Sequence, residues 1–137
     1  MSQHRELVNP PELHPAPGFS HVAIASGRRV VHFAGQVALD RQFGIVGGDD
    51  LGEQTKAAMR NVELAMDAAG VGWDDIVRRT IYTLHPTEFA TITAAIDEVT
   101  GGAEHPAQTI VGVTGLAVAG LLIEIECTAV VAQQWPT

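Results

Sequence analysis

Hydrophobic residues recur with two different spacings along the chain, and these spacings predict where strands and helices form. Residues 21–25 and 29–34 are short apolar runs with several β-branched side chains, which is typical of strands. The segment Ser26-Gly27-Arg28 between them has the composition of a tight turn. We therefore expect these two runs to form a β-hairpin.

A helical pattern follows. Between Asp50 and Gly70 apolar residues recur every three or four positions, at Ala58, Val62 and Met66 among others. The Asp50 carboxylate is placed to accept from the free N–H groups of the first turn, and Gly70 is suited to end the helix. This pattern predicts an amphipathic helix with one face on a sheet.

The rest of the chain repeats both patterns. We predict strands over 76–84, 108–114 and 121–131, and a second helix from Pro86 to Gly101. The element order is ββ-α-β-α-ββ. Because each helix has a single apolar stripe, this order predicts a two-layer α+β domain.

The N-terminal segment differs from this pattern. Residues 1–18 contain four of the seven prolines, so we expect an extended, loosely structured arm there. Residues 19–137 then form one domain, a size that can bury a substantial core.

The last predicted strand has a polar face as well as an apolar one. Strand alternation places Ile123 and Ile125 on the same side as Cys127, and Glu124 and Glu126 on the other. Two interpretations remain open: a solvent-exposed strand face, or a face covered by another subunit. In the second, a partly desolvated carboxylate is a candidate general base.

Composition and charge exclude several classes of function. Eight Lys and Arg against sixteen Asp and Glu give a net charge of −8, which disfavours a nucleic-acid partner. No run approaches the length of a membrane helix, and we expect a soluble, cytoplasmic protein.

Histidine and cysteine do not suggest a metal or a nucleophile. The six histidines lack the spacing of a zinc site, so we expect no metal and no other cofactor. His21 is expected to pack or hydrogen-bond. Cys127, the single cysteine, falls on the predicted core side, where a thiol behaves as a small apolar group.

Six segments in order resemble the YjgF/RidA (Rid) family, over about residues 17–131. They are Pro17-Gly18-Phe19-Ser20-His21, Phe33-Ala34-Gly35-Gln36, Gln54-Thr55 with Asn61-Val62, Phe89-Ala90-Thr91, His105-Pro106-Ala107-Gln108-Thr109 and Ile123-Glu124-Ile125-Glu126. The last two are the most specific, since they resemble the family's Pro-Ala-Arg-Ser/Thr and Val-Glu-Ile-Glu signatures.

The resemblance implies a chorismate-mutase-like fold assembled as a homotrimer, with a central barrel of sheets, helices outside and ligand clefts between subunits. In deaminating members an arginine after Pro-Ala grips the substrate carboxylate. The first glutamate of the Glu-Ile-Glu strand positions the water that attacks an imine. Carried onto this chain, the resemblance gives Glu124 and Gln108 as candidate catalytic residues. The candidate ligand-binding residues are Phe19, His21, Gly35, Gln36 and Thr109.

The arginine position is where the chain departs from the family. It holds Gln108, a neutral amide that cannot form the two charge-assisted hydrogen bonds that a guanidinium makes to a carboxylate. The loss amounts to about 1.5–3 kcal/mol of binding. Phe19 in place of a tyrosine also removes a hydroxyl. We therefore expect no standard 2-aminoacrylate deaminase.

Three hypotheses remain at this point. The chain is a Rid protein that binds a small metabolite and hydrolyses an imine- or enamine-like compound, or it is a non-catalytic ligand-sensing or interaction trimer. The third, an endoribonuclease, is disfavoured by the net charge of −8 and by the absence of a basic or aromatic stripe.

Overall fold

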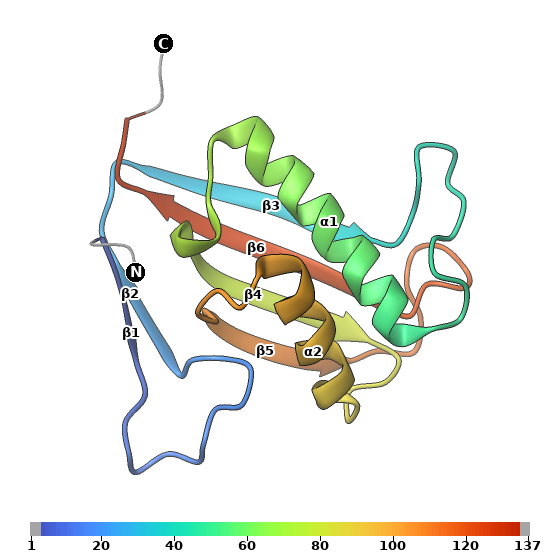
Figure 1. Cartoon of the computed structure of the whole chain (residues 1–137), viewed down its shortest axis with the longest axis horizontal. Coiled ribbons are helices and arrows are strands. Elements are labelled where there is room, and N and C mark those ends of the chain that lie inside the picture. Colours follow the sequence, from blue (N-terminus) through green and yellow to red (C-terminus); the bar gives the residue numbers. More distant parts are fainter. Residues whose placement is uncertain (1–3, 135–137) are drawn as a thin grey trace.

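The computed structural model describes residues 4–134 and contains a mixed sheet, a separate strand pair and two helices (Figure 1). The elements are β1 (Arg5–Val8), β2 (Val22–Ala25), β3 (Arg29–Val37), α1 (Leu51–Ala69), the 3₁₀ turn η1 (Trp73–Asp75), β4 (Ile76–Thr83), α2 (Phe89–Thr100), β5 (Ala107–Gly112) and β6 (Ile123–Val131). The predicted α+β class is confirmed.

The four-stranded sheet has the order β3-β6-β4-β5. β6 is antiparallel to both of its neighbours, whereas β4 and β5 are parallel and are connected through α2. A parallel pair needs such a crossover, and the crossover here places α2 above the β4–β5 edge. That position matters for the site described below.

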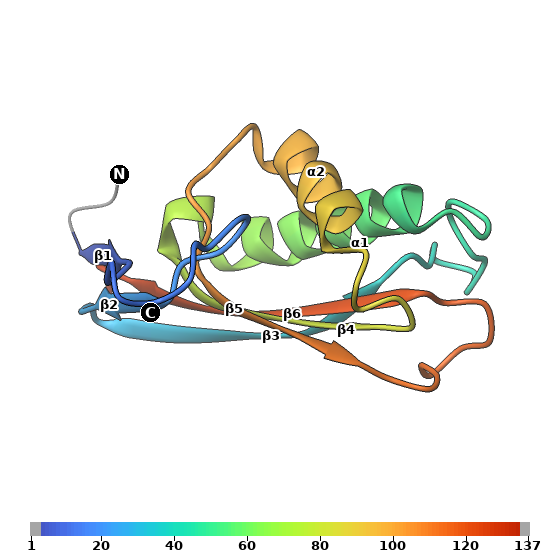
Figure 2. The ribbon, with the colours of Figure 1, turned by 90° about the horizontal axis from the view of Figure 1, so that it is seen from below.

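Both helices cover the same face of the sheet, and the other face carries no helix (Figure 2). The covered side holds the core, to which α1 contributes Met59 and Val62 and β6 contributes Ile123 and Ile125, all fully buried. Along β6 buried and half-buried residues alternate throughout, as the period of two predicted. The uncovered face includes Glu124 and Glu126.

The predicted hairpin of residues 21–34 is wrong. β2 pairs with β1, in antiparallel register from Val8–Val22 to Arg5–Ala25, while β3 pairs with β6. The Arg28 N–H donates to the Val131 carbonyl at 2.9 Å, so the turn is bound to the end of β6 and the two strands diverge. β1 also lies inside the segment expected to be a loose arm, whose residues 1–3 are outside the described part.

The helix ends agree with the capping pattern. The Asp50 side chain accepts from the Glu53 N–H at 2.8 Å, and Gly70 adopts the left-handed backbone after α1. Gly101 does the same after α2. Within residues 4–134 no helix is long and apolar enough to cross a bilayer.

Candidate functional site

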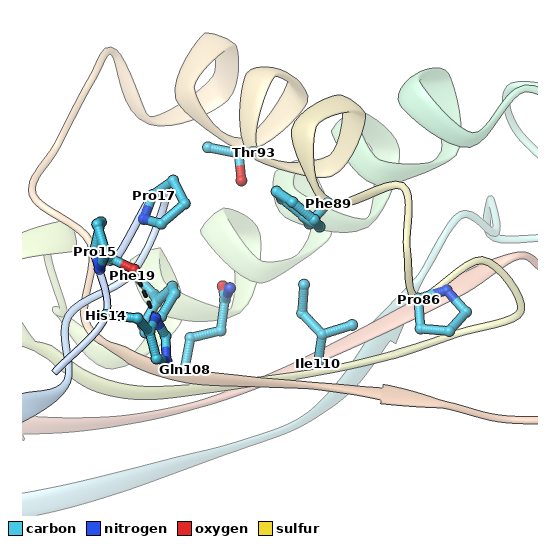
Figure 3. A pocket seen from close by; sticks show the side chains of 9 residues that line it. All are labelled: His14, Pro15, Pro17, Phe19, Pro86, Phe89, Thr93, Gln108 and Ile110. Atoms are coloured by element: carbon cyan, nitrogen blue, oxygen red, sulfur yellow. Dashed lines mark hydrogen bonds between the residues drawn. The ribbon is translucent and has the colours of Figure 1, made fainter.

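Gln108 lies in a cavity of about 400 Å³ between the β5 edge, α2 and the loop that follows β1. Figure 3 shows its side chain rising from β5 toward α2, beside Ile110 and opposite Phe89. The walls are mostly apolar, and no side chain among them is Asp, Glu, Lys or Arg. The lining residues are His14, Pro15, Pro17, Phe19, Pro86, Phe89, Thr93, Gln108 and Ile110.

Part of this wall differs from the sequence expectation. Each helix was predicted to have a single apolar stripe, and Ile92 and Ile96 of α2 are buried as such a stripe requires. Phe89 itself is 47% exposed, because it stands at the first turn of α2, where the helix overhangs the cavity.

A buried arginine stands directly behind Gln108. Arg79 is opposite Gln108 in the parallel β4–β5 register and is only 4% exposed. Its Nε donates to Gln108 Oε1, and its Nη2 donates to the Gly18 carbonyl at 3.1 Å. Nη2 also lies 2.9 Å from His105 Nδ1. The guanidinium thus joins β5, the loop before β2 and the loop after α2.

The network continues to a carboxylate. Since Arg79 is donor-only, His105 Nδ1 must accept from it, which leaves the proton on Nε2 for Asp97 Oδ1 at 2.8 Å. Burial, followed by the nearby Arg79 charge, lowers the pKa of His105 below its usual range. Burial also lowers the pKa of Arg79 to about 10, so its guanidinium stays charged at neutral pH.

Glu124 lies on the opposite, uncovered face of the sheet. It lines an open hollow with Tyr82 and Glu126, and the Tyr82 hydroxyl donates to Glu126 Oε1 at 2.7 Å. The hydrogen bond to Glu126 is the largest cause of a raised pKa at Tyr82. Within one chain, Glu124 and Gln108 therefore do not share a cavity.

Gly35 gives Glu124 its space. A β-carbon added at Gly35 would overlap the Glu124 carboxylate, with Oε2 nearest. Gly35 also lies where the β3–β6 register shifts, between Phe33 and Gln36. The absence of a side chain at position 35 therefore lets this carboxylate lie close to the backbone of β3.

Of the remaining candidate residues, Phe19 and His21 contact each other beside the cavity. Phe19 lines the cavity with Gln108, and its ring meets the His21 ring edge-on at 5.2 Å. His21 donates through Nε2 to the His14 carbonyl at 2.8 Å, and its backbone N–H donates to Asn9. It thus orders the loop that forms one cavity wall.

Gln36 and Thr109 are not in the cavity. Gln36 donates to the Ala34 carbonyl at 3.2 Å within β3. Thr109 points to the uncovered face, where its hydroxyl accepts from Arg78 Nη2 at 2.7 Å. The structure thus places Phe19 with Gln108, Gly35 with Glu124, and Thr109 with Arg78.

Sequence reasoning missed Arg79, His105 and Asp97 as a connected group. A signal was present for Arg79, because a period of two places it on the same face as Ile81 and Thr83. A charged residue at a core-facing strand position needs partners, and those come from segments distant in sequence.

Cys127 is buried, as its position on the core side of β6 predicted. Burial raises the pKa of its thiol to about 11, which leaves almost no thiolate at neutral pH. The structure gives this cysteine the properties of a core residue.

Comparison with known proteins places this geometry in a family. The model of the endoribonuclease L-PSP family, which covers the YjgF/RidA proteins, matches residues 10–131. The chain belongs to the YjgF/RidA family. The family that the six ordered segments predicted is therefore confirmed.

Solved Rid structures share the fold. The structure of YyfB from Yersinia pestis, a Rid protein of unknown function, is 37% identical with a TM-score of 0.87, covering 94% of this chain and all of that one. Rv2704 of Mycobacterium tuberculosis, from the YjgF/YER057c/UK114 family, is 31% identical with a TM-score of 0.63, covering 93% and 99%.

A curated relative of this Rid protein has a named reaction. The 2-iminobutanoate/2-iminopropanoate deaminase of Salmonella typhimurium is 32% identical, over 71% of this chain and 76% of its own length. A RutC family protein of Synechocystis is 31% identical, over 85% and 89%.

Proposed function

We propose that this Rid protein binds a small metabolite in clefts between the subunits of a homotrimer and hydrolyses an imine- or enamine-like compound there. It is not a standard 2-aminoacrylate deaminase. The observation that carries the proposal is the cavity at Gln108, whose walls contain no charged side chain. The sequence resemblance implies that Gln108 stands where deaminating members have their substrate-binding arginine.

The carboxylate-binding function is not taken over by Arg79. Its Nε is engaged by Gln108 and its Nη2 by Gly18 and His105, behind the cavity wall. A substrate carboxylate would therefore meet one amide in place of a two-pronged guanidinium, which weakens binding by about 1.5–3 kcal/mol.

Glu124 supplies the candidate base of the proposed reaction. It lies on the uncovered sheet face, so it reaches a cleft only if a neighbouring subunit brings Gln108 of one chain and Glu124 of another together. The proposed reaction adds water to the imine carbon, with Glu124 taking a proton from the water and returning it to the nitrogen. Loss of ammonia then leaves a carbonyl compound.

The test compares this protein with the deaminase of Salmonella typhimurium. Both act on enzymatically generated imines of amino acids, and the measured quantity is the rate of 2-oxo acid release. We expect this protein to release 2-oxo acid from 2-aminoacrylate at least about 100-fold more slowly, because both binding and orientation of the carboxylate are lost. Turnover equal to that of the deaminase would contradict the proposal.

A second set of imines, which lack a carboxylate, tests whether the protein hydrolyses imine-like compounds at all. Turnover of such compounds should fall sharply in Glu124→Gln, which keeps the shape but not the proton acceptor. Glu98→Gln, at an exposed position of α2, is the matched control and should keep wild-type turnover.

A non-catalytic ligand-binding trimer is the second candidate. It is favoured by the placement of Gln108 and Glu124 on opposite faces within one subunit. Ligand binding that persists in Glu124→Gln without turnover of any imine would select this alternative. The cytoplasmic location predicted above stays a prediction.

A further inference from the structure

The orientation of the Gln108 amide is fixed from behind. Gln108 Oε1 accepts from Arg79 Nε. A flipped amide would turn its NH₂ group against this donor and leave a buried guanidinium N–H without an acceptor, which costs about 1–3 kcal/mol. The oxygen therefore faces Arg79.

The amide nitrogen is consequently the group that Gln108 offers to the cavity. Among residues 4–134 no acceptor is hydrogen-bonded to Gln108 Nε2. Figure 3 shows the end of this side chain in the space between Thr93 and Ile110. Because the amide oxygen accepts from a cation, its N–H groups are polarised and become stronger donors.

The rest of the wall gives the shape and polarity of the ligand. Phe19 and Phe89 provide aromatic surfaces, and Pro17, Pro86 and Ile110 provide aliphatic ones. Such walls favour a flat, largely apolar body.

We propose that this cavity selects an uncharged, flat ligand with a carbonyl-type oxygen acceptor, to which Gln108 Nε2 donates, and that Arg79 is the positioning residue that fixes this polarity. The inference deepens the proposed function, because it rests on the Gln108 cavity being the ligand site.

Charged ligands fit this cavity less well for different reasons. A carboxylate would exchange its hydration for a single amide donor in an apolar wall, which leaves most of its charge unsatisfied. A cation would face the donor end of Gln108 with the Arg79 charge behind it. A neutral carbonyl needs one donor and receives one.

Three planar probes of matched size test this preference for a neutral ligand. Acetophenone only accepts hydrogen bonds, benzoate is anionic, and benzamidine is cationic and only donates hydrogen bonds. We would follow the Ile110 methyl and Gln108 amide resonances by NMR during titration of the intact protein. We expect acetophenone to bind about ten-fold more tightly than either charged probe.

Gln108→Glu is the decisive variant. Its carboxylate can still accept from Arg79, but it offers the cavity an acceptor in place of a donor. Acetophenone should bind about ten-fold more weakly, and benzamidine should become the preferred probe. Gln42→Glu, which adds the same charge in an exposed loop, should leave the wild-type order unchanged.

Arg79→Lys tests the positioning role. A lysine cannot donate to Gln108, Gly18 and His105 together, so the amide should become free to flip. The preference for acetophenone over benzamidine should then fall toward parity, and the shift separation of the two Gln108 amide protons should shrink. A merely structural Arg79 would lower thermal stability without changing either readout.

Three results would overturn the inference: benzoate as the tightest probe, an unchanged order in Gln108→Glu, or no shift at Ile110 with any probe at millimolar concentration. If Arg79→Lys does not fold, the Gln108 variant still decides. Carboxylate-free imine turnover that depends on Glu124 would survive any of these results, so failure here is distinct from failure of the proposed function.

Discussion

At the scale of single residues, the contact between Gly35 and Glu124 shows how a backbone position can determine a side-chain position. The Glu124 carboxylate occupies the volume that any β-carbon at position 35 would need. A change of one atom on β3 therefore acts on a candidate catalytic group of β6.

We predict that Gly35→Ala lowers the free energy of unfolding by about 1–3 kcal/mol, because the carboxylate must leave a half-buried position or the strands must separate. Urea denaturation measures the effect. In a Glu124→Ala background the same change should cost much less, since the overlapping atoms are gone. Equal costs in both backgrounds would show that Glu124 is not the obstacle.

Residue patterns made some of the site visible before the structure did. The alternation along Ile123-Glu124-Ile125-Glu126 correctly separated a core face from a polar one, because period two is a local property. The partners of Arg79 were not visible, because Gly18, Gln108 and His105 come from segments that only the folded chain brings together.

At the scale of elements, strand pairing is where sequence reasoning failed. Residues 21–25 and 29–34 were predicted as strands, and the structure has strands at 22–25 and 29–37. Their partners, however, are β1 and β6. A short turn between two strands permits a hairpin without requiring one. β1 itself was missed because four residues beside two prolines carry almost no periodic signal.

The loop from α2 to β5 carries a pH dependence through His105. In the folded protein burial and Arg79 hold the pKa of His105 below its usual range, whereas in the unfolded chain it titrates near about 6.5. Below that pH His105 is protonated in the unfolded state but still largely neutral in the folded state. Stability therefore falls as the pH drops through this range and is unaffected by His105 above it.

We predict that His105→Asn, which keeps an acceptor for Arg79 but does not titrate, loses less stability than the wild type between about pH 7.5 and pH 5.5. Urea denaturation at several pH values gives the slope of the free energy of unfolding against pH for the variant and for the wild type. An identical slope for His105→Asn would contradict the assignment.

At the scale of the whole molecule, the helices cover one face of the sheet and leave the other bare (Figure 2). That face carries Val30, which is 61% exposed, and the exposed strand residue Val111. Glu124 and Glu126 lie on the same face. An apolar and charged face of this kind fits the interior of the proposed trimer.

We predict that sedimentation equilibrium gives three times the mass of the chain. Val30→Glu should shift the population toward smaller species, because it buries an unpaired charge in the assembled state. Leu64→Glu, at a position of α1 that is 66% exposed, should leave the assembly intact. A wild-type monomer would contradict both the trimer and the intersubunit cleft.

The prolines in the cavity wall affect the entropy of ligand binding. Pro15 and Pro17 lie in the loop after β1, and Pro86 precedes α2. Their rings fix the backbone on two sides of the space before any ligand arrives. A ligand that enters the cavity therefore orders little additional backbone. The entropy cost of loop ordering, which commonly opposes binding, is largely met when the protein folds.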